Sequence, residues 1–203
     1  PEVLEIIQEI EDNPLSLADA TQKIYQGIIT SADSIFLVET TEQMGDLTVV
    51  ENGHGEQFKI ESKLLHPFLK GKDVKRYAPL DPPLQVILPY RVDDNELEFI
   101  PEESLRSEFP RAFEYFKSHE SKLRSRDSGS MDTERWYDFT RAQNMSEFLN
   151  DKIVTPEISY GGNFTLDETG VLHKSKVYGI VSEENIDNKY LLTLLNSKLF
   201  WFY

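Results

Sequence analysis

Hydrophobic side chains recur at helical spacing in three parts of the chain. Apolar residues three and four positions apart in residues 3–10 predict a short amphipathic helix, which Asn13-Pro14 would end. Phenylalanines at helical spacing predict the clearest mid-chain helix over Glu108–Leu123. A leucine-rich run predicts a third helix over Lys189–Tyr203, with four aromatic residues at its end.

Short runs of β-branched and aromatic residues, separated by turn residues, predict strands. They are Ile24–Ile29, Ile35–Val38, Leu47–Val50, Glu56–Ile60, Gln85–Tyr90, Lys152–Ile158, Asn163–Leu166 and Val177–Val181. The segment Asn52-Gly53-His54-Gly55 is typical of a hairpin tip. Helices and strands do not alternate regularly, so we predict an α+β fold: an irregular many-stranded β body with a mid-chain helix and a C-terminal helix.

The stretch Leu64–Tyr77 (LLHPFLKGKDVKRY) has an apolar half and a basic half. We predict a short helix over Leu64–Leu69, with Ser62 as its N-cap. Four of the seven residues from Lys70 to Arg76 are cationic, which suits phosphate binding. The alternative is a helix end with Gly71 as C-cap, where cations offset the helix macrodipole. Spacing alone favours the alternative.

Charge is distributed unevenly along the 203 residues, whose formal net charge is −15. Residues 1–69 hold 3 basic and 13 acidic residues, whereas residues 70–141 hold 13 basic and 15 acidic residues. The chain is too acidic to be chosen as a nucleic-acid binder on total charge, although a basic face remains possible in its middle third. No run of about 18 apolar residues predicts a membrane span. The absence of cysteine excludes disulfides and is compatible with the cytoplasm.

Sequence signatures of catalysis are absent. The four histidines lie far apart, and the chain has neither a glycine-rich phosphate loop nor a nucleophile elbow. Glu61-Ser62-Lys63 matches the tail of a metal-dependent nuclease motif, but such tripeptides arise by chance. We therefore expect no catalytic, cofactor-binding or metal-binding residue in this chain, and binding is the remaining class of function.

Several stretches, in this order, resemble the C-terminal specificity domain of TaqI-like adenine-specific DNA methyltransferases and Eco57I-like fused restriction–modification enzymes. They are Ile24–Phe36 (IYQGIITSADSIF), Leu64–Tyr77, Phe116–Arg126 (FKSHESKLRSR), Trp136–Arg141 (WYDFTR), Lys152–Gly170 (KIVTPEISYGGNFTLDETG) and Tyr190–Tyr203 (YLLTLLNSKLFWFY). The blocks G-K-D-x-x-R-Y and L-L-N-S-K-L are the most specific. The turn at Thr30-Ser31 departs from the family, which often has Thr-Gly there.

The resemblance implies a DNA target recognition domain over residues 14–203, with a helical hairpin truncated after its first helix. Residues 1–13 would be a linker helix from a catalytic domain outside this chain. That domain would transfer a methyl group from S-adenosylmethionine to adenine through an Asn-Pro-Pro-Tyr-type motif. The segments Asn13-Pro14-Leu15-Ser16 and Asp81-Pro82-Pro83-Leu84 both lack the aromatic residue of that motif. The parent would be a methyltransferase, with or without an endonuclease activity, and double-stranded DNA its partner.

Cations and aromatic residues interleave in the middle third, as DNA binding requires. We predict phosphate contacts for Lys72, Lys75 and Arg76, phosphate or guanine contacts for Arg124, Arg126 and Arg141, and base-edge contacts for Tyr160 and Asn163. The alternative for these residues is an ordinary aromatic core beside surface cations. The alternative function is a protein-interaction module. A continuous positive cleft joining residues 70–76 with 122–141 would favour DNA, and dispersed cations would favour the interaction module.

Overall fold

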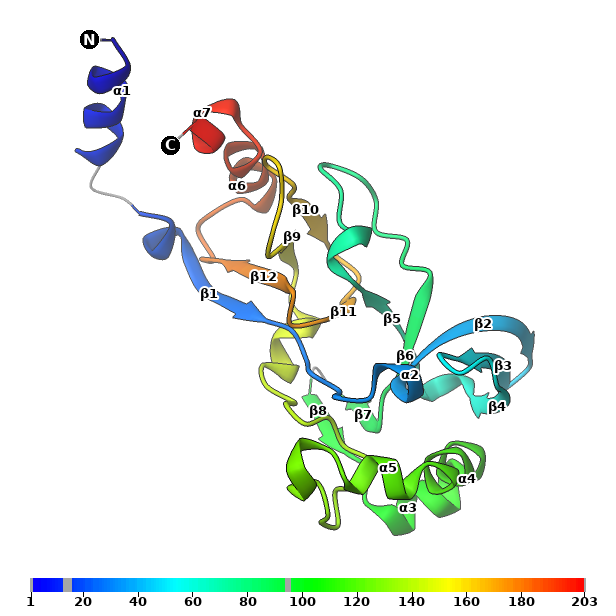
Figure 1. The fold of residues 1–203 in the computed structure, drawn as a ribbon. Coiled ribbons are helices and arrows are strands. Elements are labelled where there is room, and N and C mark those ends of the chain that lie inside the picture. Colours follow the sequence, from blue (N-terminus) through cyan, green and yellow to red (C-terminus); the bar gives the residue numbers. More distant parts are fainter. Residues whose placement is uncertain (1, 13–15, 94–95, 203) are drawn as a thin grey trace.

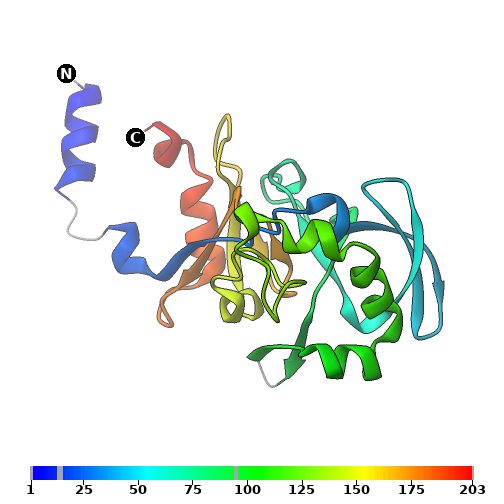
Figure 2. The same ribbon diagram turned by 60° about the horizontal axis from the view of Figure 1, so that its bottom comes forward.

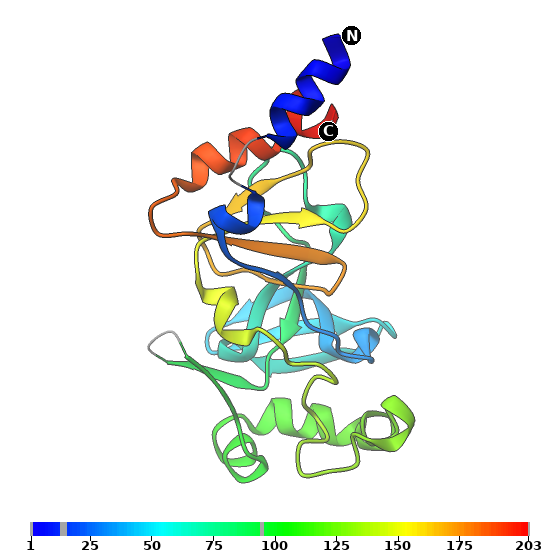
Figure 3. The ribbon, with the colours of Figure 1, turned by 90° about the vertical axis from the view of Figure 1, so that its left-hand side faces the viewer.

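A computed structural model of the chain describes residues 2–12, 16–93 and 96–202. Within these ranges the strands form sheets of four, six and two strands. The sheets lie between the terminal helices at one end of the molecule and the mid-chain helices at the other (Figures 1 and 3). This arrangement confirms the predicted α+β class and its many-stranded β body.

The four-stranded sheet is antiparallel throughout. Its strands, in spatial order, are β1 (Thr21–Gln26), β12 (Val177–Ser182), β9 (Lys152–Pro156) and β10 (Thr165–Asp167). A 3-10 turn, η1 (Leu17–Ala20), precedes β1. Successive residues of β9 point to opposite faces: Ile153 packs against leucines of the C-terminal helix, and Val154 packs against Leu69 and Val74. Strand β9 therefore joins two cores.

A buried ion pair sets the register of β9 against β10. Lys152 and Asp167 are directly opposite each other, form a salt bridge and have no exposed side-chain surface. The Lys152 amine also donates to the Phe148 carbonyl over 2.8 Å. The Asp167 carboxylate accepts hydrogen bonds from the backbone amides of Thr169 and Val171. Both charges are thus paired and hydrogen-bonded, as burial of charge requires.

The six-stranded sheet carries the hairpin that the sequence predicts. Its strands, in spatial order, are β11 (Leu172–His173), β5 (Leu65–Leu69), β6 (Leu84–Ile87), β2 (Leu37–Met44), β3 (Leu47–Asn52) and β4 (Gln57–Glu61). Only the pair β11–β5 is parallel among these strands of the described residues. The turn between β3 and β4 falls on residues 53–55, which confirms the predicted hairpin tip.

Two apolar runs form elements other than those predicted. Residues 65–69 form strand β5 between β6 and β11 instead of a helix, and Ser62 opens the 3-10 turn η2 (Ser62–Leu64) instead of capping a helix. A run of five residues is too short to show whether its apolar side chains repeat with the period of a helix or of a strand. Pro67 within the run disfavours a helix. Conversely, Ile35 lies in the helical turn α2 (Asp33–Phe36) rather than in a strand, and β2 begins after it.

The predicted mid-chain helix is divided. It forms α4 (Pro110–Ser118) and α5 (Glu120–Arg124), and a helix that was not predicted, α3 (Glu102–Glu108), precedes them. Phe109 leaves the helical region, with φ −132° and ψ 59°, because the residue before a proline is disfavoured there. The hairpin β7 (Tyr90–Asp93) and β8 (Glu96–Phe99) joins β6 to these helices. The 3-10 turns η4 (Asp127–Gly129) and η5 (Met145–Leu149) follow them.

The aromatic block at Trp136–Arg141 belongs to the main core. Trp136 and Tyr137 have no exposed surface, and Phe139 is only 3% exposed. Tyr137 stacks on Phe116 with ring centroids 5.8 Å apart, and its hydroxyl donates to the Ile100 carbonyl over 2.6 Å. These aromatic residues therefore belong to an ordinary aromatic core, which was the alternative to DNA contacts.

The terminal helices lie at one end of the molecule (Figures 1 and 2). They are α1 (Glu2–Glu11), α6 (Asn188–Leu195) and α7 (Lys198–Phe202). The predicted C-terminal helix is broken at Asn196-Ser197, and the Asn13-Pro14 end of the first helix lies outside the described residues. The assignment of residues 1–13 as a linker stays a prediction. Among the described residues, every helix is too short or too polar to cross a membrane.

Replacing Lys152 tests the importance of the buried pair. In Lys152→Met the Asp167 carboxylate stays buried without its cation, so we expect a loss of about 3–5 kcal/mol in the free energy of unfolding. Urea unfolding followed by circular dichroism measures this loss. The control is Lys23→Met, which removes a 2.9 Å surface pair with Glu147 whose lysine is 42% exposed; it should cost at most about 1 kcal/mol. Similar small losses in both variants would contradict the assignment.

Candidate functional site

An open cleft of about 700 Å³ lies between the segment that follows β5 and the loop that joins β9 to β10. Both segments are near the terminal helices in Figure 1. Five of the eight predicted binding residues line this cleft: Lys72, Lys75, Arg76, Tyr160 and Asn163. They come from parts of the chain about 90 residues apart, so the fold brings together two groups that were predicted separately.

The basic segment of residues 70–76 is an exposed turn, and no helix precedes it. The 3-10 turn η3 (Gly71–Asp73) follows strand β5, and the Asp73 carboxylate accepts the Lys70 amide over 2.8 Å. Val74 is buried against Leu69 and anchors the turn, whereas Lys72 and Lys75 are exposed. The alternative of cations at a helix end with Gly71 as C-cap is therefore wrong. Within the described residues, neither lysine forms a salt bridge.

Arg76 joins three parts of the cleft. Its backbone amide donates to the Asn163 side chain over 2.7 Å, and its Nη2 donates to the Asn196 carbonyl over 2.7 Å. The Asn163 amide also donates to the Val74 carbonyl over 3.3 Å. Asn196, 2% exposed, exchanges two side-chain hydrogen bonds with the backbone of Phe164. Arg76 and Asn163 thus hold the cleft together, a role that the prediction of direct DNA contacts did not include.

The β9–β10 loop presents its side chains at the rim of the cleft. Tyr160 is 105% exposed, and the neighbouring Ile158 is 82% exposed. Both line the cleft, together with Gly161 and Gly162. The prediction of a recognition residue at Tyr160 therefore falls on a side chain that the fold leaves accessible.

Lys176 is a cleft residue that the sequence analysis missed. It lies just before β12 and forms a 2.8 Å salt bridge with Glu157 on the facing loop. The hydrogen bond that Lys176 donates to Glu157 raises the pKa of Lys176, which stays charged at neutral pH. No local pattern marks this lysine, because only the pairing of β12 with β9 places it beside the cleft.

Arg126 is buried and lies away from the cleft. Its guanidinium donates to the carbonyls of Leu123, Thr30, Trp136 and Asp138 over 2.5–2.8 Å. Burial lowers its pKa to about 10, so it remains a cation at neutral pH. The predicted DNA contact of Arg126 is corrected here: its donors connect α5 to the Trp136 block and to the segment before α2.

Arg124 and Arg141 are also outside the cleft lining, which includes no residue from 122–141. Arg124 forms 2.9 Å and 2.8 Å salt bridges with Glu120 and Asp132, so two carboxylates already pair with its positive charge. Arg141 is exposed, and its backbone pairs with Ile29. The described residues thus do not form one continuous positive cleft from residues 70–76 to 122–141. Cations dispersed in this way favour the protein-interaction module, so DNA binding needs support from other observations.

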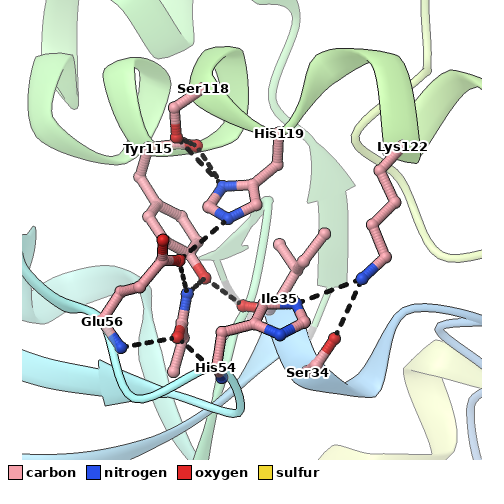
Figure 4. A network of polar contacts seen from close by, with 9 residues as sticks. Ser34, Ile35, His54, Glu56, Tyr115, Ser118, His119 and Lys122 are labelled. Carbon is pink, nitrogen blue, oxygen red and sulfur yellow. Dashed lines mark hydrogen bonds and ion pairs between the residues drawn. The ribbon is translucent and has the colours of Figure 1, made fainter.

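A second polar cluster fastens the mid-chain helices to the β3–β4 hairpin (Figure 4). The Tyr115 hydroxyl donates to the Ile35 carbonyl over 2.7 Å. His119 Nε2 lies 3.6 Å from the Glu56 carboxylate, and Lys122 Nζ lies 3.1 Å from His54 Nε2. The His119 and Lys122 contacts join the α4–α5 segment to the hairpin tip, and the Tyr115 bond joins α4 to α2. These contacts therefore have a structural role.

The Glu61 carboxylate of the nuclease-like tripeptide also has a structural role. It accepts the backbone amides of Arg111 and Ala112 over 2.8 Å and 2.9 Å. These amides belong to the first turn of α4. A carboxylate there accepts hydrogen bonds from amides that have no partner within the helix, and its charge interacts favourably with the helix dipole. Its hydrogen bonds give no support to a nuclease function.

Known proteins similar to this chain include methyltransferases. The sequence model of the TaqI-like C-terminal specificity domain matches residues 66–203. The Type II methyltransferase M.BanIII of Aneurinibacillus aneurinilyticus is 23% identical over 177 residues, which are 83% of this chain and 27% of that protein. The Type II restriction enzyme and methyltransferase RM.Eco57I of Escherichia coli is 25% identical over 196 residues, 88% of this chain and 20% of that protein. The chain thus spans about a quarter or less of these relatives.

The buried position of Arg126 makes a prediction that a DNA contact would not. In Arg126→Lys an ammonium cannot reach all four carbonyls, so we expect a loss of about 2–4 kcal/mol in the free energy of unfolding. Thermal unfolding by circular dichroism measures the loss. The surface variant Arg141→Lys should change stability by at most about 0.5 kcal/mol. Equal stability of the two variants would show that the buried guanidinium is dispensable.

Proposed function

Because this chain belongs to the family of TaqI-like C-terminal specificity domains, we propose that it binds double-stranded DNA sequence-specifically as a target recognition domain. The family match confirms the resemblance seen in the sequence. Both relatives are methyltransferases, and one is also a restriction enzyme. The proposed parent is accordingly an adenine-specific DNA methyltransferase or a fused type II restriction–modification enzyme. It would use S-adenosylmethionine, act in the cytoplasm and supply the catalytic domain that partners this one.

The observation that carries this proposal is the charge of the cleft. In a chain with a formal net charge of −15, the cleft is lined by four cations and one carboxylate: Lys72, Lys75, Arg76 and Lys176, with Glu157. Cations grouped at one exposed site attract phosphate, and phosphate contacts fix the position of a protein on a duplex. The acidic remainder of the chain limits binding elsewhere.

We assign different roles to the residues of the cleft. Lys72 and Lys75 are exposed, so they contact phosphates. Arg76 and Asn163 are engaged with the backbone and position the cleft, with Arg76 keeping guanidinium donors for a phosphate. Tyr160 is the group that reaches the bases. Arg141 and Arg124 would contact a duplex only as a separate site, since they do not line the cleft.

A second candidate function is protein docking at the C-terminal end. The side chains of Leu199, Phe200, Trp201 and Phe202 are 40–58% exposed, and Tyr190 on α6 is 66% exposed. Exposed hydrophobic clusters mark interaction sites. Docking of the catalytic domain here is compatible with DNA binding in the cleft, so the two proposals can both hold.

Salt dependence tests the phosphate contacts. We expect the 203-residue chain to bind a labelled duplex of mixed sequence, with an affinity that falls steeply as KCl rises. Lys72→Gln and Lys75→Gln should each weaken binding and reduce the slope of log K against log [KCl] by about one. Fluorescence anisotropy at several KCl concentrations measures both quantities.

The matched control is Lys59→Gln, because Lys59 is exposed on β4 outside the cleft. It should leave the affinity and the slope unchanged. If all three glutamine variants behaved alike, the cleft would not be the DNA site. If the unmodified chain bound no duplex while its C-terminal surface captured a catalytic domain, protein docking would replace DNA binding as the proposed function.

A further inference from the structure

Two large hydrophobic side chains protrude into solvent from the β9–β10 loop. Tyr160 is 105% exposed and Ile158 is 82% exposed, whereas Tyr115 and Tyr137 are buried in the main core. Both protruding side chains line the cationic cleft. Their exposure contributes nothing to folding, so their position beside the cations calls for a functional explanation.

The loop holds these side chains on an anchored base. At one end the Glu157 amide donates to the Lys176 carbonyl over 2.9 Å, and at the other Asn196 binds both backbone groups of Phe164. Ser159 Oγ donates to the Gly161 carbonyl over 2.8 Å, which closes the tip. The tip is therefore a short, fastened projection.

Two glycines make this projection possible. Gly161 has a φ of +139°, which side chains rarely adopt. At Gly162 a Cβ atom would lie 3.0 Å from the Leu195 carbonyl oxygen, so the absence of a side chain lets the loop approach the end of α6. The sequence Tyr160-Gly161-Gly162 thus directs the tyrosine outward.

The chemistry of the tip favours stacking over edge recognition. Reading a base edge requires hydrogen-bonding groups held in place by neighbours, and the Ile158 side chain has none. A flat aromatic ring stacks on any base, and apolar side chains enter opened base steps as wedges. The cations of the cleft would hold the phosphates on either side of such a step.

We propose that Tyr160, supported by Ile158 on the same loop, inserts into the duplex and stacks on a base at an opened step. The inference rests on the proposed DNA binding, and it names what the loop recognises: an unstacked base rather than a base edge. Opening an intact step costs free energy, and a missing base removes much of that cost. A wedge therefore binds a duplex with an abasic site more tightly than an intact duplex.

Two duplexes of one sequence test the wedge, one intact and one with a single abasic site. By anisotropy, the 203-residue chain should bind the abasic duplex about five- to a hundredfold more tightly, because most of the cost of opening the step is already removed there. Tyr160→Phe keeps the ring and should keep the preference, whereas Tyr160→Ala should lose it. Met44→Ala, which removes an exposed hydrophobic side chain of β2 outside the cleft lining, is the control and should keep it.

The outcomes separate the wedge from DNA binding itself. Equal affinity of the unmodified chain for both duplexes, or an undiminished preference in Tyr160→Ala, would overturn the wedge and leave DNA binding standing. A loss of preference in Tyr160→Phe as well would assign it to the hydroxyl, and hence to edge contact. Binding to neither duplex would overturn both proposals. Lys72→Gln should lower the affinity for both duplexes by the same factor, because a phosphate contact does not depend on the missing base.

Discussion

Hydrogen bonds around Arg76 join the two sides of the cleft. The guanidinium reaches the carbonyl of Asn196, and the Arg76 amide reaches the side chain of Asn163. Asn196 in turn holds the backbone of Phe164 at the end of the β9–β10 loop. These three residues are far apart in the chain, and their contacts give the basic turn and the loop a common base, together with the hydrogen bond from the Tyr77 amide to the Phe164 carbonyl. The most specific sequence blocks of the family, G-K-D-x-x-R-Y and L-L-N-S-K-L, thus meet physically at Arg76 and Asn196.

Burial determines what each cation does. Arg126 and Lys152 are surrounded by carbonyls or paired with a carboxylate in the interior, where an unmatched charge would be costly. Lys72 and Lys75 lie on a solvent-exposed turn and form no salt bridge within the described residues. Cationic residues therefore stabilise the interior in one place and remain accessible to a ligand in another. Positive charge in the middle third of the sequence belongs partly to the core and only partly to the cleft.

The cleft and the exposed C-terminal surface share one helix. The end of α6 supplies Asn196 to the base of the cleft, and α7 with its exposed aromatic residues follows directly. A protein docked on α7 would consequently lie beside bound DNA. If the proposed DNA binding and the proposed docking of a catalytic domain both hold, this proximity would let both domains reach the same duplex.

The sequence by itself determined the α+β class and the β3–β4 hairpin, which follow from local periodicity and turn chemistry. Residue type and loop position indicated five residues of the cleft, and the resemblance of ordered sequence blocks to known proteins indicated the family. It did not determine that residues 65–69 form a strand, since a short apolar run fits either period until it pairs with β6 and β11. Only the tertiary structure placed Lys176 in the cleft and Arg126 in the core. Whether a cation faces water or carbonyls depends on which distant strands pack around it, and that information is absent from its sequence neighbours.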